Sequence, residues 1–295
     1  MSDQLQQPAG IKPKKLLRRA VTAIGYGAVV LGAIFLGGYP PLGRLAPLAL
    51  GAVLAVFAAL ASAEFYALER RESRLPNEAF GIAAAALMPL AAALWGMAGL
   101  SSVVTLLIAA SLVWHVVFVR VRTVDTATTV FGAVYTGFLL SYLVLILRTF
   151  HGGLPGYQLG QLLALTVVVS VWLNDTLAYL VGSSIGRHKL VPRISPKKSW
   201  EGFIAGLLGS IVVWLALALL VPASGISVGW AVATGTAVGV AVLVGDLFES
   251  RLKREAGVKD SGASLPGHGG FLDRLDSLIL VGLVAYWMLW WGGIR

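Results

Sequence analysis

Two aspartates and a glycine-rich turn near the C-terminal end of the chain have the residue types needed to hold a metal–phosphate complex. Asp273 and Asp276 are three positions apart and face one way on a helix. The preceding residues, 266–270, contain a proline and three glycines, a tight turn whose backbone can approach a ligand closely. At the start of a helix such a turn offers free N–H groups to an anion. The pattern predicts Mg²⁺ held by carboxylates and substrate phosphates. The alternative is a structural loop in which either aspartate pairs with Arg274 or Lys259.

A third carboxylate, Asp246, directly follows a run of 44 uncharged residues, 202–245. It therefore lies at or just inside the edge of the bilayer, where an ionised carboxylate costs roughly a few kcal/mol unless it is paired or bound to a cation. If the helix continues, Glu249, Ser250 and Lys253 share its face. The alternative is a helix end that only reaches towards water.

A pair of lysines precedes the run 202–245. We predict that Ser195 is the N-cap and Pro196 the first residue of the helix that contains this run. Lys197 and Lys198 would then oppose the helix dipole, an arrangement that favours a bound anion. The alternative is a lysine pair that only marks the cytoplasmic side of the membrane.

Two further carboxylates lie within or beside apolar runs. Asp175 shares a helix face with the tyrosine and the glycine four and seven positions later, and an intramembrane carboxylate is a candidate functional residue. For Glu64 we predict instead a pair with Arg70 or Arg71.

The elements that position these residues are membrane helices. Of 295 residues, 57% are hydrophobic and 13% charged, whereas soluble domains carry about 25% charged residues. This composition excludes a disordered or water-soluble chain, and the lack of cysteine excludes thiolate chemistry. A helix that crosses the bilayer needs about 20 apolar residues, and the apolar runs lack the alternation of barrel strands. We predict an all-α, polytopic integral membrane protein of about nine transmembrane helices: 20–43, 45–63, two within 79–119, 126–147, 149–174, two within 202–245, and 277–294.

Two of these runs are long enough to fold into helix pairs. The turn of the first pair is predicted at Gly96–Gly99, and that of the second around Pro222–Gly229. The helix in the run 149–174 is expected to use the second half of the run and to continue past Asp175.

The basic residues orient the chain. With nine spans, 20 of the 23 lysines and arginines fall on one side, which places the N-terminus in the cytoplasm and the C-terminus outside. The net charge of +9 therefore indicates a bilayer partner and no nucleic acid. The basic start of the chain resembles a signal peptide, but an uncleaved first helix is expected. We predict a cytoplasmic tail at 1–19, a transmembrane region of five helices at 20–150, and a catalytic region of four helices at 151–295.

Together these residues predict a polar cavity that faces the cytoplasm. His268, flanked by glycines, is favoured as a hydrogen-bond donor to phosphate over a general acid or base. A membrane-embedded phosphoryl or nucleotidyl transferase acting on a lipid fits this set best.

The segment 250–276, SRLKREAGVKDSGASLPGHGGFLDRLD, closely resembles the signature of the phosphatidate cytidylyltransferases (CDP-diacylglycerol synthases). Segments 174–182 and 195–202 also resemble this family, so the resemblance covers roughly residues 170–280. The signature positions, all present, are Ser250, Lys253, Arg254, Lys259, Asp260, Pro266, His268, Gly269, Gly270, Asp273, Arg274 and Asp276.

The resemblance implies that CTP and phosphatidic acid are converted to CDP-diacylglycerol and pyrophosphate, a step of phospholipid biosynthesis, at a bacterial-type plasma membrane. It implies Mg²⁺, with K⁺ as an optional second ion, on Asp246 and Asp273. The expected catalytic residues are Asp246, Asp273, Asp276, Lys253 and His268. The expected substrate-binding residues are Asp175, Ser195, Lys197, Lys198, Ser199, Ser250, Arg254, Lys259, Gly269, Gly270 and Arg274. The lipid phosphate is already anionic, so catalysis would rest on positioning and charge neutralisation.

Alternatives remain at this point. A related synthase could use an isoprenoid-ether phosphatidate. A CDP-alcohol phosphotransferase would need an Asp-Gly-x2-Ala-Arg motif, which is absent. A secondary transporter with Asp175 as its ion site would predict inverted repeats, which are not evident. Glycine-rich faces such as Gly25–Gly37 permit a homodimer without establishing one.

Overall fold

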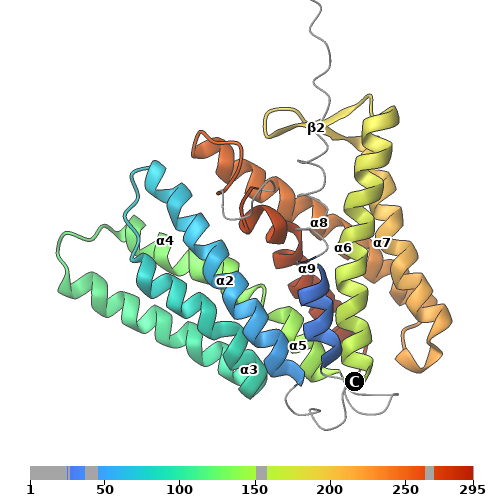
Figure 1. Ribbon diagram of the computed structural model, residues 1–295, viewed down its shortest axis with the longest axis horizontal. Coiled ribbons are helices and arrows are strands. Elements are labelled where there is room, and N and C mark those ends of the chain that lie inside the picture. Colours follow the sequence, from blue (N-terminus) through green and yellow to red (C-terminus); the bar gives the residue numbers. More distant parts are fainter. Residues whose placement is uncertain (1–24, 26, 37–45, 151–157, 263–268, 295) are drawn as a thin grey trace, which may run out of the picture.

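The computed structural model describes residues 25, 27–36, 46–150, 158–262 and 269–294. The described chain is a bundle of helices with one short β hairpin (Figure 1). Its elements are α2 (Ala46–Arg71), α3 (Glu78–Val117), α4 (Thr123–Ala133), the π-helix η3 (Val134–Phe138), α5 (Tyr142–Thr149), α6 (Gln158–Ile185), β1 (Lys189–Val191), β2 (Ser195–Ser199), α7 (Trp200–Leu220), the 3-10 helix η4 (Pro222–Ser224), α8 (Val228–Glu255) and α9 (Leu272–Trp291).

Six helices in the described residues are long and apolar enough to cross a membrane: α2, α3, the continuous run from α4 to α5, α6, α7 and α8. An all-α integral membrane protein is therefore confirmed in outline. The predicted course of α6 past Asp175 and the paired helices on either side of residues 222–224 are also confirmed. The count of nine spans and the orientation of the termini stay predictions. Of the predicted first span, residues 27–35 are described as helical, and most of the remainder lies outside the described residues.

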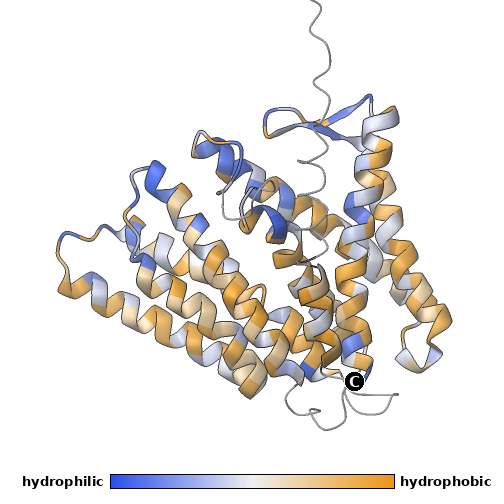
Figure 2. Ribbon diagram, in the orientation of Figure 1, coloured by the Kyte–Doolittle hydropathy of each residue, from blue (hydrophilic) through white to orange (hydrophobic). Residues whose placement is uncertain are grey.

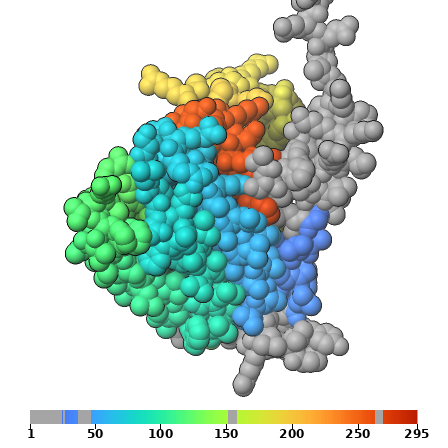
Figure 3. Space-filling view, turned by 60° about the vertical axis from the view of Figure 1, so that its left-hand side comes forward, coloured from blue at the N-terminus to red at the C-terminus, as the bar shows by residue number. Residues whose placement is uncertain are grey.

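A glycine divides α3 into two arms. Gly96 has φ +65° and ψ −145°, outside the helical region. The second arm turns back closely enough that a Cβ on Gly99 would lie 2.5 Å from the Ala91 carbonyl oxygen. Arg148 of α5 donates to the carbonyl of Ala93 at 2.6 Å and so satisfies an acceptor at the end of the first arm. The turn predicted at residues 96–99 is therefore present, and the helix breaks at Gly96. In Figure 3, the teal residues of α3 form the lower part of the surface, and the yellow β hairpin lies at the top.

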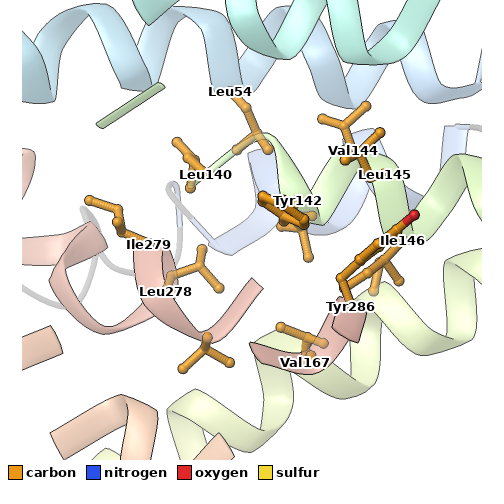
Figure 4. Close-up of a cluster of buried hydrophobic side chains, with 14 of the residues drawn as sticks. Leu54, Leu140, Tyr142, Val144, Leu145, Ile146, Val167, Leu278, Ile279 and Tyr286 are labelled. Atoms are coloured by element: carbon orange, nitrogen blue, oxygen red, sulfur yellow. The ribbon is translucent and has the colours of Figure 1, made fainter. Parts of the chain in front are cut away.

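The buried core joins the two halves of the chain at α5. Figure 4 shows side chains from α5 lying between Leu54 of α2, Val167 of α6 and Ile279 of α9. Tyr142 and Tyr286 meet edge to face, with ring centroids 5.2 Å apart. Because lipid tails are as apolar as leucine, this core stabilises the bundle through close packing more than through exclusion of water.

Small residues bring α6 and α7, and likewise α8 and α9, close together. A Cβ on Gly206 of α7 would lie 2.6 Å from Asn174 Oδ1, and Asn174 Nδ2 donates to Ser210 Oγ at 2.9 Å. A Cβ on Gly245 of α8 would lie 2.5 Å from the carbonyl oxygen of Asp276. Such contacts let helix backbones approach in a membrane, and here they fix the helix positions that carry Asp175, Asp246 and Asp276.

The prediction that Ser195 and Pro196 begin a helix is wrong. Residues 195–199 form strand β2, which pairs antiparallel with β1 next to the ends of α6 and α7 (Figure 1). Helix α7 begins at Trp200, and its N-cap is Ser199, whose Oγ accepts from Gly202 N at 3.2 Å. Two serines four positions apart are both suitable caps, and the pairing of residues 195–199 with β1 decides between them.

Candidate active site

A cavity of about 810 Å³ lies between α6, the β hairpin, α7, α8 and the start of α9. Its size lies in the range of about 300–1,000 Å³ that is usual for ligand sites. All its lining residues fall between 174 and 277. Figure 2 shows hydrophilic residues gathered at the end of the bundle that carries the hairpin and the C-terminal end of α8. The predicted site residues that line the cavity are Asp175, Lys197, Lys198, Ser199, Asp246, Lys253, Asp273, Arg274 and Asp276.

Asp246 lies on α8 facing the hairpin. Lys198 Nζ of β2 lies 2.5 Å from Asp246 Oδ2, and both side chains are partly buried. Ser250, one turn further along α8, donates to Asp246 Oδ1 at 3.2 Å. The predicted continuation of this helix past Asp246 is therefore confirmed, and its carboxylate is paired with a lysine.

Asp273 is held by a buried lysine and by backbone N–H groups. Lys253 Nζ lies 2.7 Å from Asp273 Oδ1 and 2.5 Å from Glu249 Oε2. Gly270 N donates to Asp273 Oδ2 at 2.8 Å. Burial raises the pKa of Asp273. Hydrogen bonds from Glu249, Lys253 and Gly270 N lower this pKa by more than burial raises it, so that it is about 2. Asp273 is therefore ionised at neutral pH.

Asp276 lines the cavity together with two other carboxylates, Asp175 and Asp246. Burial, followed by repulsion from Asp246 and Asp175, raises the pKa of Asp276 above its ordinary value. Protonation of Asp276 relieves this repulsion, and a bound cation would relieve it in the same way. In the part of the chain that the structure describes, no group of three or more His, Asp or Glu side chains could hold a metal ion. A metal here would therefore need water or substrate oxygens among its ligands.

Three described N–H groups at the start of α9, which the sequence suggested would be free, donate to carboxylates. Gly270 N donates to Asp273, while Phe271 N and Leu272 N donate to Glu64 at 3.0 and 2.9 Å. For the described N–H groups of residues 270–272, the prediction of an open helix terminus is wrong, because two carboxylates already accept from them.

The predicted pairing of Glu64 with Arg70 or Arg71 is also wrong. Glu64 points from α2 to the start of α9, while Arg70 pairs with Glu78. A carboxylate buried next to backbone N–H groups gains more from those donors than from an arginine at an exposed helix end.

Gly269 shapes the turn around Asp273. Its φ is +88°, in the region that favours glycine, and a Cβ there would lie 2.6 Å from Asp273 Oδ2. The glycines of this turn thus position an aspartate, and a direct contact with substrate stays a prediction.

The remaining predicted site residues that the structure describes are not on the lining of the cavity. Arg254 Nε donates to the carbonyl of Ile194 at 3.4 Å, next to the hairpin turn. His268 lies outside the described residues. Among the described residues, Ser195, Ser250, Arg254, Lys259, Gly269 and Gly270 are not part of the lining.

Some lining residues were not predicted as site residues. Asn174, Lys189 and Glu249 all face the cavity. For Glu249 a signal was present, because it lies three positions after Asp246 and four before Lys253 on one helix face. Lys189 had no such signal, since only the pairing of β1 with β2 brings it to the site.

The sequence is similar to those of known proteins. A phosphatidate cytidylyltransferase of Thermotoga maritima is 41% identical over 157 residues, which is 52% of this chain and 55% of that protein. The chloroplastic phosphatidate cytidylyltransferase 5 of Arabidopsis thaliana is 39% identical over 178 residues, 54% of this chain and 44% of that protein. A phosphatidate cytidylyltransferase of Staphylococcus aureus is 50% identical over 111 residues, 38% of this chain and 42% of that protein.

The chain spans about half the length of these curated relatives. The model of the cytidylyltransferase family matches residues 17–291, which is nearly the whole sequence and includes every residue that lines the cavity. The chain therefore belongs to the cytidylyltransferase family.

Proposed function

We propose that the protein is a phosphatidate cytidylyltransferase, which converts CTP and phosphatidic acid to CDP-diacylglycerol and pyrophosphate. One observation carries the proposal: the cavity gathers Asp175, Asp246 and Asp276 with lysines and an arginine at the polar end of apolar helices. Carboxylates and cations in one cavity suit a metal-bound triphosphate, and its place at the end of membrane helices suits a lipid headgroup. Family membership and the names of the relatives support the same reaction.

We place this cavity on the cytoplasmic side of a bacterial-type plasma membrane. The support is the distribution of basic residues along the sequence. In this orientation CTP reaches the cavity from the cytoplasm and phosphatidic acid reaches it from the inner leaflet. The N-terminal half of the described chain contributes no lining residue, in keeping with a catalytic region at 151–295.

The carboxylate set fits Mg²⁺. The donors are hard oxygens, and Mg²⁺ usually takes one or two carboxylates together with waters and substrate phosphates. We propose Asp246 and Asp273 as its ligands, with Asp276 beside them and K⁺ as an optional second ion. When bound, the ion would neutralise charge that develops on the phosphates.

The chain's own cations position the reacting groups. Lys198 and Lys253 are each held by a carboxylate at the cavity, which keeps their ammonium groups where phosphates would bind. Lys197, Lys189 and Arg274 add positive charge to the same lining. The phosphate of the lipid attacks the α-phosphorus of CTP, and pyrophosphate leaves with the bonding electrons. No strong general base is needed, since the nucleophile is already an anion.

The experiment that tests the proposal is turnover by purified protein in mixed micelles of detergent and phosphatidic acid. We expect CTP-dependent formation of CDP-diacylglycerol with one pyrophosphate released per product. Pyrophosphate release of equal rate without added lipid would contradict the proposal. An isoprenoid-ether phosphatidate tested in parallel would show which lipid the cavity accepts better.

A further inference from the structure

A buried carboxylate outside the cavity holds the segment that carries two of the cavity's aspartates. Glu64 of α2 is 6% exposed and is not among the lining residues. From described residues 197 to 208 positions later in the chain it accepts three hydrogen bonds: from Ser261 Oγ at 2.9 Å, from Phe271 N at 3.0 Å and from Leu272 N at 2.9 Å. One carboxylate thus joins α2 to both sides of the glycine-rich turn.

These bonds supply the cap that α9 lacks locally. Phe271 is the N-cap residue of α9, and within the described residues its side chain makes no capping hydrogen bond. The first N–H groups of a helix need an acceptor, and a carboxylate there also interacts favourably with the helix dipole. Glu64 therefore fixes the start of α9 from another helix.

The packing around Glu64 leaves this carboxylate little room to move. A Cβ on Gly262 would lie 2.6 Å from Glu64 Oε1, and a Cβ on Gly270 would also collide with the carboxylate. The ring of Phe57, two turns earlier on α2, contacts the ring of Phe271 at a centroid distance of 5.5 Å. The two backbone segments therefore lie directly against the Glu64 side chain.

Ser261 connects Glu64 to the cavity. Its Oγ donates to Glu64, and its backbone N donates to Asp273 Oδ2 at 3.2 Å. Gly270 N donates to the same oxygen of Asp273 at 2.8 Å. Any shift of Ser261 or of the start of α9 would therefore change the position of Asp273.

We propose that Glu64 is a positioning residue for the transfer reaction. It orders Ser261 and the first turn of α9, so that Asp273 and Asp276 face the cavity, and it acts without touching either substrate. This inference rests on the proposed function, because positioning matters only if these aspartates take part in the reaction.

The test replaces Glu64 by glutamine and uses Glu69→Gln as the matched control. Glutamine keeps the shape but turns an acceptor oxygen into an NH₂ donor that faces other donors. Glu69 lies on the same helix, is 4% exposed and pairs with Arg74, so its variant also loses a buried carboxylate. For Glu64→Gln we expect kcat to fall about tenfold to a hundredfold, the scale seen for small displacements of reacting groups. KM for CTP should change little, and Glu69→Gln should keep the wild-type kcat.

A second readout does not depend on activity. Hydrogen–deuterium exchange of residues 269–276 should be faster in Glu64→Gln and unchanged in Glu69→Gln. If Glu64→Gln proves unstable in detergent, Ser261→Ala removes one of the three bonds and should show a smaller effect of the same kind.

Three outcomes overturn the proposal: unchanged exchange in Glu64→Gln, faster exchange with wild-type kcat, or equal loss of kcat in the two glutamine variants. If the wild-type protein shows no CTP-dependent turnover, the proposed function fails and the positioning role fails with it. The exchange data would then still show whether Glu64 anchors α9.

Discussion

Lys198 of strand β2 and Asp246 of helix α8 form an ion pair across the cavity, with Nζ 2.5 Å from Oδ2. They are 48 positions apart in the sequence. Nothing in the residues around either of them predicts that the two side chains pair. The β hairpin brings them together, because β2 pairs with β1 next to the end of α6, and Lys198 of β2 reaches Asp246 of α8. This pair neutralises a carboxylate in the cavity before any substrate phosphate arrives.

Asp246→Asn should abolish turnover without unfolding the protein. A metal ligand contributes several kcal/mol of transition-state stabilisation, so we expect a loss of at least about a hundredfold in kcat/KM. The control is Glu201→Gln, which removes a carboxylate near the hairpin that pairs with His188 and does not line the described cavity. Rates measured in the same micelles check this. An Asp246→Asn protein with near wild-type turnover would remove the metal assignment.

Lys198→Met should lower kcat/KM for CTP more than it lowers the stability of the protein. The substitution leaves Asp246 without its cation and takes a positive charge from the phosphates, so we expect kcat/KM for CTP to fall about tenfold or more. Lys198→Arg should keep part of the activity because it keeps the charge. Arg193→Met, in the turn of the same hairpin and outside the described lining, is the control. Equal effects of Lys198→Met and Arg193→Met on CTP use would argue against a specific role for Lys198.

Gly269→Ala should lower kcat more than Gly257→Ala does. Both glycines have positive φ, +88° and +67°, so alanine strains the backbone by about 1–2 kcal/mol at either position. At Gly269, however, the added Cβ would lie 2.6 Å from Asp273 Oδ2, whereas at Gly257 nothing lies within 4 Å. Thermal stability and kcat of both variants check this. If kcat falls equally in both, the contact with Asp273 does not matter for turnover.

Ser199→Ala should destabilise the protein by about 1 kcal/mol, the usual loss for an N-cap serine. Ser195→Ala should have a much smaller effect, since Ser195 lies in β2 rather than at the helix start. Thermal unfolding in detergent compares the two. A larger loss for Ser195→Ala would favour a helix that begins at residue 195 after all.

Removal of divalent ions should stop turnover reversibly. The described cavity has carboxylates that repel one another but no set of three that could hold a metal, so we expect the ion to arrive largely with CTP. Chelation should therefore abolish CDP-diacylglycerol formation, and added Mg²⁺ should restore it. Undiminished turnover in excess chelator would contradict a metal-dependent mechanism.

The sequence alone determined the class of structure and the inventory of charged groups. Long apolar runs specify membrane helices because a backbone in lipid must satisfy its own hydrogen bonds. The position of Asp246 at the end of such a run and the shared helix face of Glu249 and Lys253 follow from helix periodicity alone. These are local properties, so they can be predicted from neighbouring residues.

Only the tertiary structure decided which groups the carboxylates meet. Glu64 caps α9 instead of pairing with Arg70, Asp273 is held by Lys253, and Asp276 is repelled by Asp246. Each partner comes from a segment far away or from a choice among several nearby charges, and charge attraction alone does not rank them. The partner of each carboxylate depends on which backbone segments can come close to it. In this protein, glycines and a two-stranded hairpin determine which segments do.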